Sequence, residues 1–182
     1  MWRVVSGALR LDAEYDGKPT QFVRLALPGD VIGVERWAKT DNCLRAYSLV
    51  TSIVEPIETV RTQMIDLLVD AVVIAHQRSS EALELRRGPV AKRVQKLLML
   101  FGELNGGSVE SNLRCELPHL VDMADVLDAA PETISRVFSS MRDRQCVQER
   151  KPQAAVFDIA ALSELGSIAG MSASRTVKLG NA

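Results

Sequence analysis

The chain has 182 residues, 47% of them hydrophobic, and carries a formal net charge of -1. This length allows one modest hydrophobic core or two small ones, and the near-zero charge counts against a protein that binds nucleic acid through a globally basic surface. Cys43, Cys115 and Cys146 show neither paired nor metal-type spacing, so that disulfides and a zinc site are not expected.

No segment of the sequence predicts export or insertion into a membrane. The N-terminal apolar stretch is short and is broken by Arg3, Arg10 and Asp12, and the longest apolar run, 67–75, is far too short to span a bilayer. We therefore expect a cytoplasmic protein without a membrane partner.

Residues 1–55 have the pattern of β-structure. Runs rich in β-forming residues at 8–15 and 20–27 flank an Asp16-Gly17 turn, and a further β-branched run covers 47–54. We expect this segment to form about half of a sheet domain.

Residues 56–87 have a helical pattern that ends at Gly88-Pro89. An approximate heptad stripe follows one face of this helix, and it predicts a seam between two copies of the chain. A long helix inside the core of one subunit is the alternative. The residues assigned to the seam are Ile65, Leu68, Val69, Val72, Ala75, His76 and Leu83.

A third part covers residues 88–170. Its first helix carries Lys92, Arg93 and Lys96 on an outer face that we expect to be solvated, although these cations could also contact phosphate. Residues 171–182 are small and polar, and we expect them to fray.

Two short amphipathic helices follow in this third part, over 120–128 and from Pro131 onward. The connection Asp128-Ala129-Ala130 has the length expected of a helix-turn-helix. Pro131 fits the first helical position, where its missing N–H costs nothing.

Glu132, Ser135 and Arg136 project from the first turns of the second helix, away from its apolar face. An arginine can donate two hydrogen bonds to guanine, a glutamate can accept one from cytosine, and a serine hydroxyl can donate or accept. This cluster therefore suits base reading in a major groove. A surface helix with an ordinary Glu132–Arg136 ion pair is the alternative.

Charge around this cluster is only mildly positive. From Pro131 to Lys151 five basic residues stand against three acidic ones, whereas the preceding helix contains Asp122, Asp125 and Asp128 and no basic residue. DNA affinity would then depend on a dimer that doubles a small positive surface.

The run Glu132-Thr133-Ile134-Ser135-Arg136 resembles the recognition helix of the Crp/Fnr family of bacterial transcription regulators. Upstream, the segments 4–11, 16–17 and 27–33 resemble the later strands of the family's β-roll sensor domain, and 147–165 resembles its β-wing and closing helix. The resemblance covers nearly the whole chain in the family's order. It implies an α+β fold with a truncated, cyclic-nucleotide-binding-like β-roll (1–55), a dimerisation helix (56–87), a C-terminal winged helix-turn-helix (88–170) and a flexible tail (171–182).

The resemblance also implies roles for single residues. Glu132 and Arg136 fall on the pair that reads G·C, and Ser135 falls on the serine of the Fnr-type branch, which implies a TTGA-like half-site. Pro131 stands where the cyclic-AMP-binding branch has an arginine, which argues against a TGTGA-type site. Ala130 replaces a common capping residue, a loss of about 1 kcal/mol. The positions expected to contact phosphate are His119, for which helix capping is the alternative, Thr133, Arg142, Arg150 and Lys151.

The sensed signal and the cofactor stay unknown. In the family, a glutamate just after the Pro-Gly-Asp-x-x-Gly turn and an Arg-Ser pair bind the cyclic nucleotide. In this sequence Val34 follows that turn, Glu35 stands one place later than the family's glutamate, and Arg45 is shifted from the place of the Arg-Ser pair. These differences disfavour binding of a cyclic nucleotide. An iron–sulfur cluster needs four cysteines and is also disfavoured. A haem bound by His76 or a thiol switch at Cys43 is the alternative to ordinary packing or surface roles.

The sequence contains no glycine-rich phosphate loop, paired metal-ligand spacing or nucleophile elbow, so that we expect no enzyme and no catalytic or metal-binding residue. It predicts a homodimeric, sequence-specific DNA-binding transcription regulator, with double-stranded DNA, a second copy and RNA polymerase as partners. One alternative is a dimeric protein-interaction module or anti-regulator that no longer binds DNA, which the acidic first helix and Ala130 keep open. Another is a small-molecule sensor whose output is purely conformational.

Overall fold

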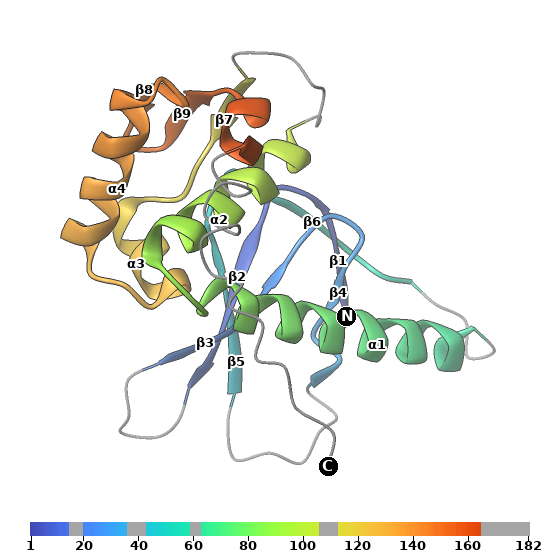
Figure 1. The fold of residues 1–182 in the computed structure, drawn as a ribbon. Helices are drawn as coiled ribbons and strands as arrows, with labels where there is room; N and C mark the ends of the chain where they lie inside the picture. The colour runs from blue at the N-terminus through green and yellow to red at the C-terminus, as the bar shows by residue number, and fades with distance from the viewer. Residues whose placement is uncertain (15–19, 36–42, 59–62, 106–112, 165–182) are drawn as a thin grey trace, which may run out of the picture.

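A computed structural model of the chain describes residues 1–14, 20–35, 43–58, 63–105 and 113–164. Two small sheets and the long helix α1 (Met64–Leu85) form its N-terminal half. Helices α2, α3 and α4 and a third sheet form its C-terminal half (Figure 1). The two halves lie against each other, and α1 projects beyond the sheets on the side of the molecule opposite to α4 (Pro131–Asp143).

Six strands form the first two sheets, in the orders β4-β1-β6 and β3-β2-β5, and every strand pair is antiparallel. Leu9, Leu11 and Ala13 place the apolar side chains of β2 on one buried face, while Asp12 on the other face is also buried. The sequence prediction of strands over 8–15 and 20–27 is confirmed by β2 and β3, while their Asp16-Gly17 turn lies outside the described residues. The strands are β1 (Trp2–Ser6), β2 (Leu9–Glu14), β3 (Gln21–Ala26), β4 (Val31–Ile32), β5 (Cys43–Ser48) and β6 (Ile53–Pro56).

Two of the crossings that the chain makes between these two sheets, from β1 to β2 and from β5 to β6, pack on each other. The first is at Gly7, whose φ is +83°. A Cβ at Gly7 would lie 2.3 Å from the Thr51 carbonyl oxygen and 2.3 Å from the Ser52 hydroxyl of the second crossing. The Ser52 hydroxyl in turn hydrogen-bonds the Ala8 backbone N–H and the Val50 carbonyl. Because of this crossing, the β-branched run over 47–54 is divided between two strands in different sheets: its first residues end β5 and its last residues begin β6.

Helix α1 lies across the first half of the molecule, with one side covered and the other free. Ala71 packs with Val31 and Val34 in a small core, and Leu67 and Leu68 flank it. Arg78 donates to the buried Asp30 carboxylate at 2.9 Å and fixes the second half of the helix to the turn before β4. The expected helical part, 56–87, therefore contains α1, although its first residue, Pro56, is the last residue of β6.

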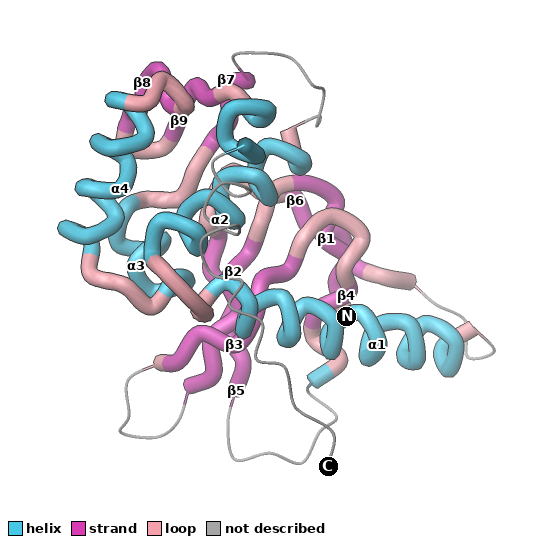
Figure 2. Tube along the Cα trace, viewed as in Figure 1, coloured by secondary structure: helices cyan, strands magenta, loops and turns pink. Residues whose placement is uncertain are grey.

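The C-terminal half contains the expected helix-turn-helix (Figure 2). Pro131 is the first residue of α4, as predicted, and Ala130 precedes it without a side-chain cap. Asp128 ends α3 in the left-handed conformation, with φ 50°, and the Ala129 N–H bonds the Ala124 carbonyl at 3.0 Å. The elements are α2 (Val90–Leu104), β7 (Leu113–Glu116), α3 (Leu120–Leu127), α4, β8 (Val147–Lys151) and β9 (Ala154–Phe157), followed by helical residues at 159–164.

Strand β7 was not predicted from the sequence. It pairs with β9, which also pairs with β8, so that the β-wing hairpin continues into a three-stranded sheet in the order β7-β9-β8. Cys115 of β7 and Phe157 of β9 are fully buried under this sheet. The sheet therefore attaches the wing to the helical core.

One hydrophobic core joins the two halves. Leu25, Leu27 and Leu49 of the first half belong to the same buried cluster as Leu98 and Phe101 of α2. Because the cluster continues through α3 and α4, β3 and the residues beside the strands of its sheet share an interior with the helix-turn-helix.

Candidate nucleic-acid interface

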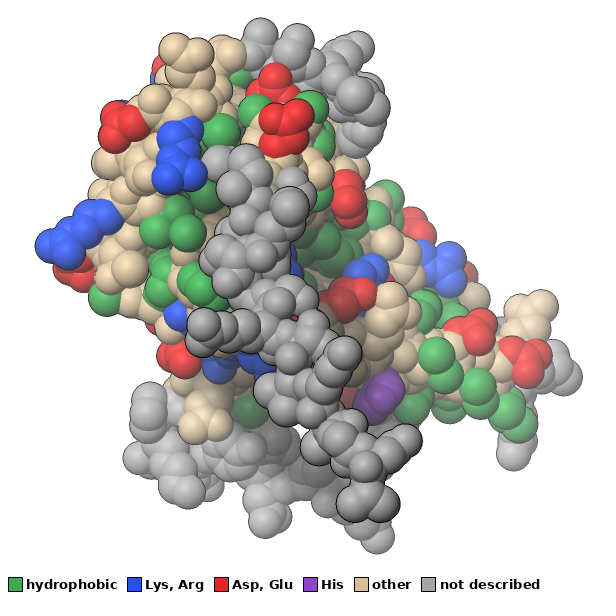
Figure 3. Space-filling view, in the orientation of Figure 1, with side chains coloured by type: hydrophobic (Ala, Val, Ile, Leu, Met, Phe, Trp, Pro, Cys, Tyr) green, Lys and Arg blue, Asp and Glu red, His purple; other side chains and the backbone are tan. Residues whose placement is uncertain are grey.

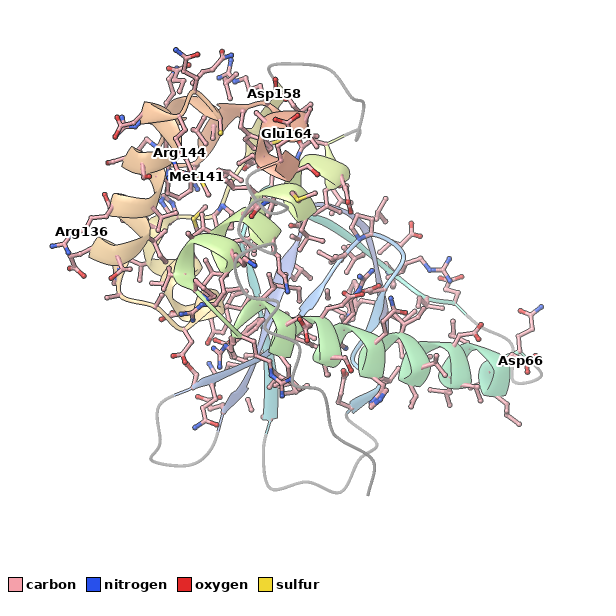
Figure 4. All side chains as sticks on the ribbon, in the orientation of Figure 1. Asp66, Arg136, Met141, Arg144, Asp158 and Glu164 are labelled. Carbon is pink, nitrogen blue, oxygen red and sulfur yellow. The ribbon has the colours of Figure 1, made fainter. Side chains whose placement is uncertain are left out.

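Helix α4 presents its predicted base-reading side chains to solvent. Glu132, Ser135 and Arg136 are exposed, whereas Ile134 and Phe138 on the opposite face are buried in the core. Figure 4 shows Arg136 pointing away from the molecule at its outer edge. No hydrogen bond or ion pair within the described part of the chain engages the three exposed side chains, so that all three are available to a ligand.

Most of the residues expected to contact phosphate lie together beside this face. A groove between α4, the start of α3 and the wing brings together one base-reading residue and four expected phosphate contacts. These are Ser135, His119, Arg142, Arg150 and Lys151. Thr133 is the exception, because it lies on the opposite flank of α4, beside Arg136 and Arg144. His119 precedes α3 without a side-chain cap bond, so that the capping alternative is not realised.

Arg150 also holds the wing against α4. Its guanidinium lies 4.4 Å from the centroid of the Phe138 ring and donates to the Lys151 carbonyl at 2.6 Å. Burial and the nearby charge of Arg142 lower the pKa of Arg150. The cation–π contact is a feature that sequence reasoning missed, since Arg150 was expected only as a phosphate contact.

Three arginines from other elements converge on the acidic helix α3. Arg10 of β2 lies 2.9 Å from Asp125 and 3.4 Å from Asp122. Arg86, just after α1, donates to the Asp125 and Val126 carbonyls at 2.6 and 3.2 Å. Cations at the carbonyl end of a helix are favourable, because they complement its dipole.

Arg93 of α2 completes this set by donating to the Leu127 and Asp128 carbonyls at 2.6 and 3.0 Å. The prediction of a solvated face is therefore wrong for Arg93, which supports the turn of the helix-turn-helix. Of the acidic side chains that counted against DNA binding in the sequence, Asp122 and Asp125 thus have a cationic partner in Arg10, while Arg86 and Arg93 add positive charge at the carbonyl end of α3.

The free side of α1 carries an exposed apolar stripe. Ile65, Val69, Val72 and Leu83 are between 56% and 70% exposed, although they are large hydrophobic residues. The side chains along this side of the helix are visible in Figure 3. His76 is exposed on the same helix and Ala75 is half-buried, while Leu68 packs toward the roll. Val73, 61% exposed, was not assigned to the seam from the sequence.

Inside the first half, the side chains weighed for cyclic-nucleotide binding have other partners. Glu35 accepts from the Arg24 guanidinium at 2.6 Å and from the Gly33 N–H at 3.0 Å, and the Arg24 side chain is only 3% exposed. Arg45 is exposed and pairs with Glu14. The arrangement at Glu35 is therefore an internal ion pair.

Cysteines and possible metal ligands are dispersed. Cys43 is exposed, while Cys115 and Cys146 are buried, and burial raises the pKa of Cys115 to about 11. Within the described residues no group of three or more His, Cys, Asp or Glu side chains is placed to hold a metal ion. None of the helices in that part of the chain has the length and apolarity needed to cross a membrane.

Comparison with known proteins identifies the fold. No protein-family model and no curated protein sequence matches the chain. Among solved structures, a CRP-family transcriptional regulator from Thermus thermophilus is similar with a TM-score of 0.72 and 19% identity, over 91% of this chain and 87% of its own. A second Thermus thermophilus regulator, of the CRP/FNR family, has a TM-score of 0.64 and 20% identity over 91% and 87%.

FixK2 from Bradyrhizobium japonicum has a TM-score of 0.67 and 21% identity, over 90% of this chain and 85% of its own. The three similarities extend over both halves of the chain, from the first sheets to the helix-turn-helix. The chain therefore has the fold of the CRP/FNR transcriptional regulators.

Proposed function

We propose that the protein is a sequence-specific DNA-binding transcription regulator that acts as a homodimer on a palindromic, TTGA-like site. The observation that carries the proposal is the exposed cluster of Glu132, Ser135 and Arg136, bordered by a groove with three cationic side chains. The solved structures with the same fold are described as transcriptional regulators, which supports the same assignment here.

The chemistry of the cluster supports base reading. The Arg136 guanidinium can donate two hydrogen bonds to O6 and N7 of guanine, and the Glu132 carboxylate can accept from N4 of cytosine. Both side chains project from the first two turns of α4, which is the part of a recognition helix that enters the major groove. Ser135 is exposed one helical turn after Glu132 and would contact an adjacent base.

The stripe on α1 supports the dimer. An exposed apolar row on a helix that projects beyond its own sheets is covered when a second copy of the helix packs against it. A two-fold axis along α1 would present two recognition helices about 34 Å apart, which matches a palindrome with half-sites one DNA turn apart. RNA polymerase would be the partner through which such a bound dimer alters transcription.

The test is selection of bound duplexes from a random pool, followed by titration of the selected palindrome and a scrambled duplex with wild-type and Arg136→Ala protein. We expect a TTGA-like palindrome to be enriched, and Arg136→Ala to remove about 1–3 kcal/mol of discrimination while the dimer stays intact. Enrichment of no sequence, or unchanged discrimination by Arg136→Ala, would contradict the proposal.

A matched pair of variants tests the dimer. Val72→Asp places a charge in the stripe, while Asp70→Asn changes a charge on an exposed face of the same helix. Sedimentation should show monomers for Val72→Asp and dimers for Asp70→Asn. A dimeric Val72→Asp protein would contradict a seam along this stripe.

The alternative is a dimeric protein-interaction module that no longer binds DNA. Val121, 65% exposed at the start of α3, is an apolar contact point that favours it. Duplex binding that weakens steeply with added salt and keeps a preference for one palindrome would exclude this alternative.

A further inference from the structure

A second groove follows the flank of α4 that faces α2. Lys92 of α2, Thr133 and Arg136 of α4, and Arg144 just after α4 line this α2-side groove, over an apolar floor. None of its lining residues in the described part of the chain is acidic. Figure 4 shows that Arg136 and Arg144 lie toward opposite ends of α4. Recognition helix α4 therefore has cationic side chains along both flanks.

Lys92 and Arg144, like Arg136, have no carboxylate partner among the described residues, whereas two nearby lysines do. Lys96, one turn after Lys92 on α2, lies 3.0 Å from Glu84, and Lys151 of the wing lies 3.2 Å from Glu149. No ion pair within the described structure therefore engages the cations of the α2-side groove, although the net charge of the whole chain is -1.

The dimensions of DNA indicate what would lie in this groove. A major groove is about 12 Å wide and a helix with its side chains is about 10–12 Å across, so that a helix in the groove has a sugar-phosphate strand against each flank. When the exposed face of α4 contacts the bases, the groove between α4, the start of α3 and the wing faces one DNA strand. The α2-side groove then faces the other DNA strand.

We infer that Lys92, Thr133 and Arg144 bind phosphates of the second DNA strand. The inference rests on the proposed function and adds a strand contact from α2, which sequence reasoning assigned to a solvated face. Lys92 supplies a compact charge, the Thr133 hydroxyl a hydrogen bond and Arg144 a planar fork that matches phosphate oxygens. Contacts of this kind fix the register of the protein on the duplex without reading its sequence.

The experiment compares wild-type protein with Lys92→Ala, Arg144→Ala and the control Lys96→Ala. Fluorescence anisotropy measures the Kd for the selected palindrome and for a scrambled duplex from about 50 to 200 mM salt. Lys92→Ala and Arg144→Ala should each lower the slope of log Kd against log salt by about one and weaken both duplexes about tenfold. Their preference for the palindrome should remain, and Lys96→Ala should behave as wild type.

Other outcomes overturn the inference in distinguishable ways. A wild-type protein without duplex preference contradicts the proposed function itself. A specific wild-type protein whose Lys92→Ala and Arg144→Ala variants match Lys96→Ala contradicts only the second-strand contact. Loss of palindrome preference in either variant would assign it to base reading or to folding. Lys92→Arg keeps the charge and should keep the wild-type salt slope; a slope like that of Lys92→Ala contradicts a phosphate contact.

Discussion

The guanidinium of Arg10 lies 2.9 Å from the carboxylate of Asp125, so that a strand of the first sheet domain binds the first helix of the helix-turn-helix. The same guanidinium lies 2.7 Å from the buried Asp12. Burial by itself would lower the pKa of Arg10, but hydrogen bonds and charges from Asp12 and Asp125 outweigh it and raise the pKa. This ion-pair network ties the orientation of α3 to the sheet beneath it.

Arg10→Ala should lower the free energy of unfolding by about 3 kcal/mol, because it leaves the Asp12 carboxylate buried without its cation. Arg45→Ala is the control, since the Arg45–Glu14 pair is largely exposed and should contribute little to the free energy of unfolding. Urea denaturation of the two variants measures the difference. Equal losses would show that the Arg10 network does not stabilise the junction.

Arg150→Ala should affect both stability and DNA binding. The substitution removes the contact with the Phe138 ring, which we expect to destabilise the wing and α4 by about 1–2 kcal/mol. Lys151→Ala, at the neighbouring exposed position, should lower the salt slope of duplex binding and leave the melting temperature near that of wild type. If Arg150→Ala left the melting temperature unchanged, the contact with the Phe138 ring would not stabilise the protein, and only the role in phosphate contact would remain.

Gly7→Ala and Gly29→Ala separate steric conflict from backbone strain. Both glycines have positive φ, +83° and +93°, but only at Gly7 would a Cβ meet other atoms within 4 Å. Gly29→Ala should cost about 1–2 kcal/mol from strain alone. Gly7→Ala should cost at least about 3 kcal/mol, because Thr51 and Ser52 must also move. Chemical denaturation measures both, and similar losses would argue against tight packing of the two crossings.

Because the thiol of Cys115 is buried, we expect the folded protein to lose stability at alkaline pH. Burial raises its folded-state pKa from 9.0 to about 11, so that between these values the unfolded state loses this proton before the folded state does. The contribution of the buried, protonated Cys115 thiol to the free energy of unfolding is therefore fully present below about pH 9, and it declines as the pH rises toward about 11. Stability measured across this range should fall less steeply in Cys115→Ala than in wild type. Parallel pH profiles would rule out this role.

The helix-turn-helix could be predicted from the sequence because its pattern is local. Pro131, the three-residue turn before it and the apolar positions of both helices specify the motif over about 20 residues. The two strands within 47–54 could not be separated, because the bend at Ser52 depends on contacts with Gly7 and Ala8, more than 40 residues earlier.

Long-range pairing explains what was missed around the candidate site as well. Strand β7 is short and depends on pairing with β9, and its sequence shows no strong alternation by itself. The acids of α3 counted against DNA binding until the fold placed Arg10 beside them. Lys92 and Thr133 lie 41 positions apart, so that only the packing of α2 against α4 shows that they line one groove.

The core shared by Leu25, Leu49, Leu98 and Phe101 has an evolutionary consequence. A substitution at this boundary in the first half changes the surface against which α2 packs, and α2 in turn packs against α4. A substitution in α2 likewise changes the surface against which the first half packs. The two halves therefore cannot diverge independently or be exchanged between proteins as ready-made modules without compensating changes at this boundary. Substitutions at positions that do not contact this common interior are free of the constraint.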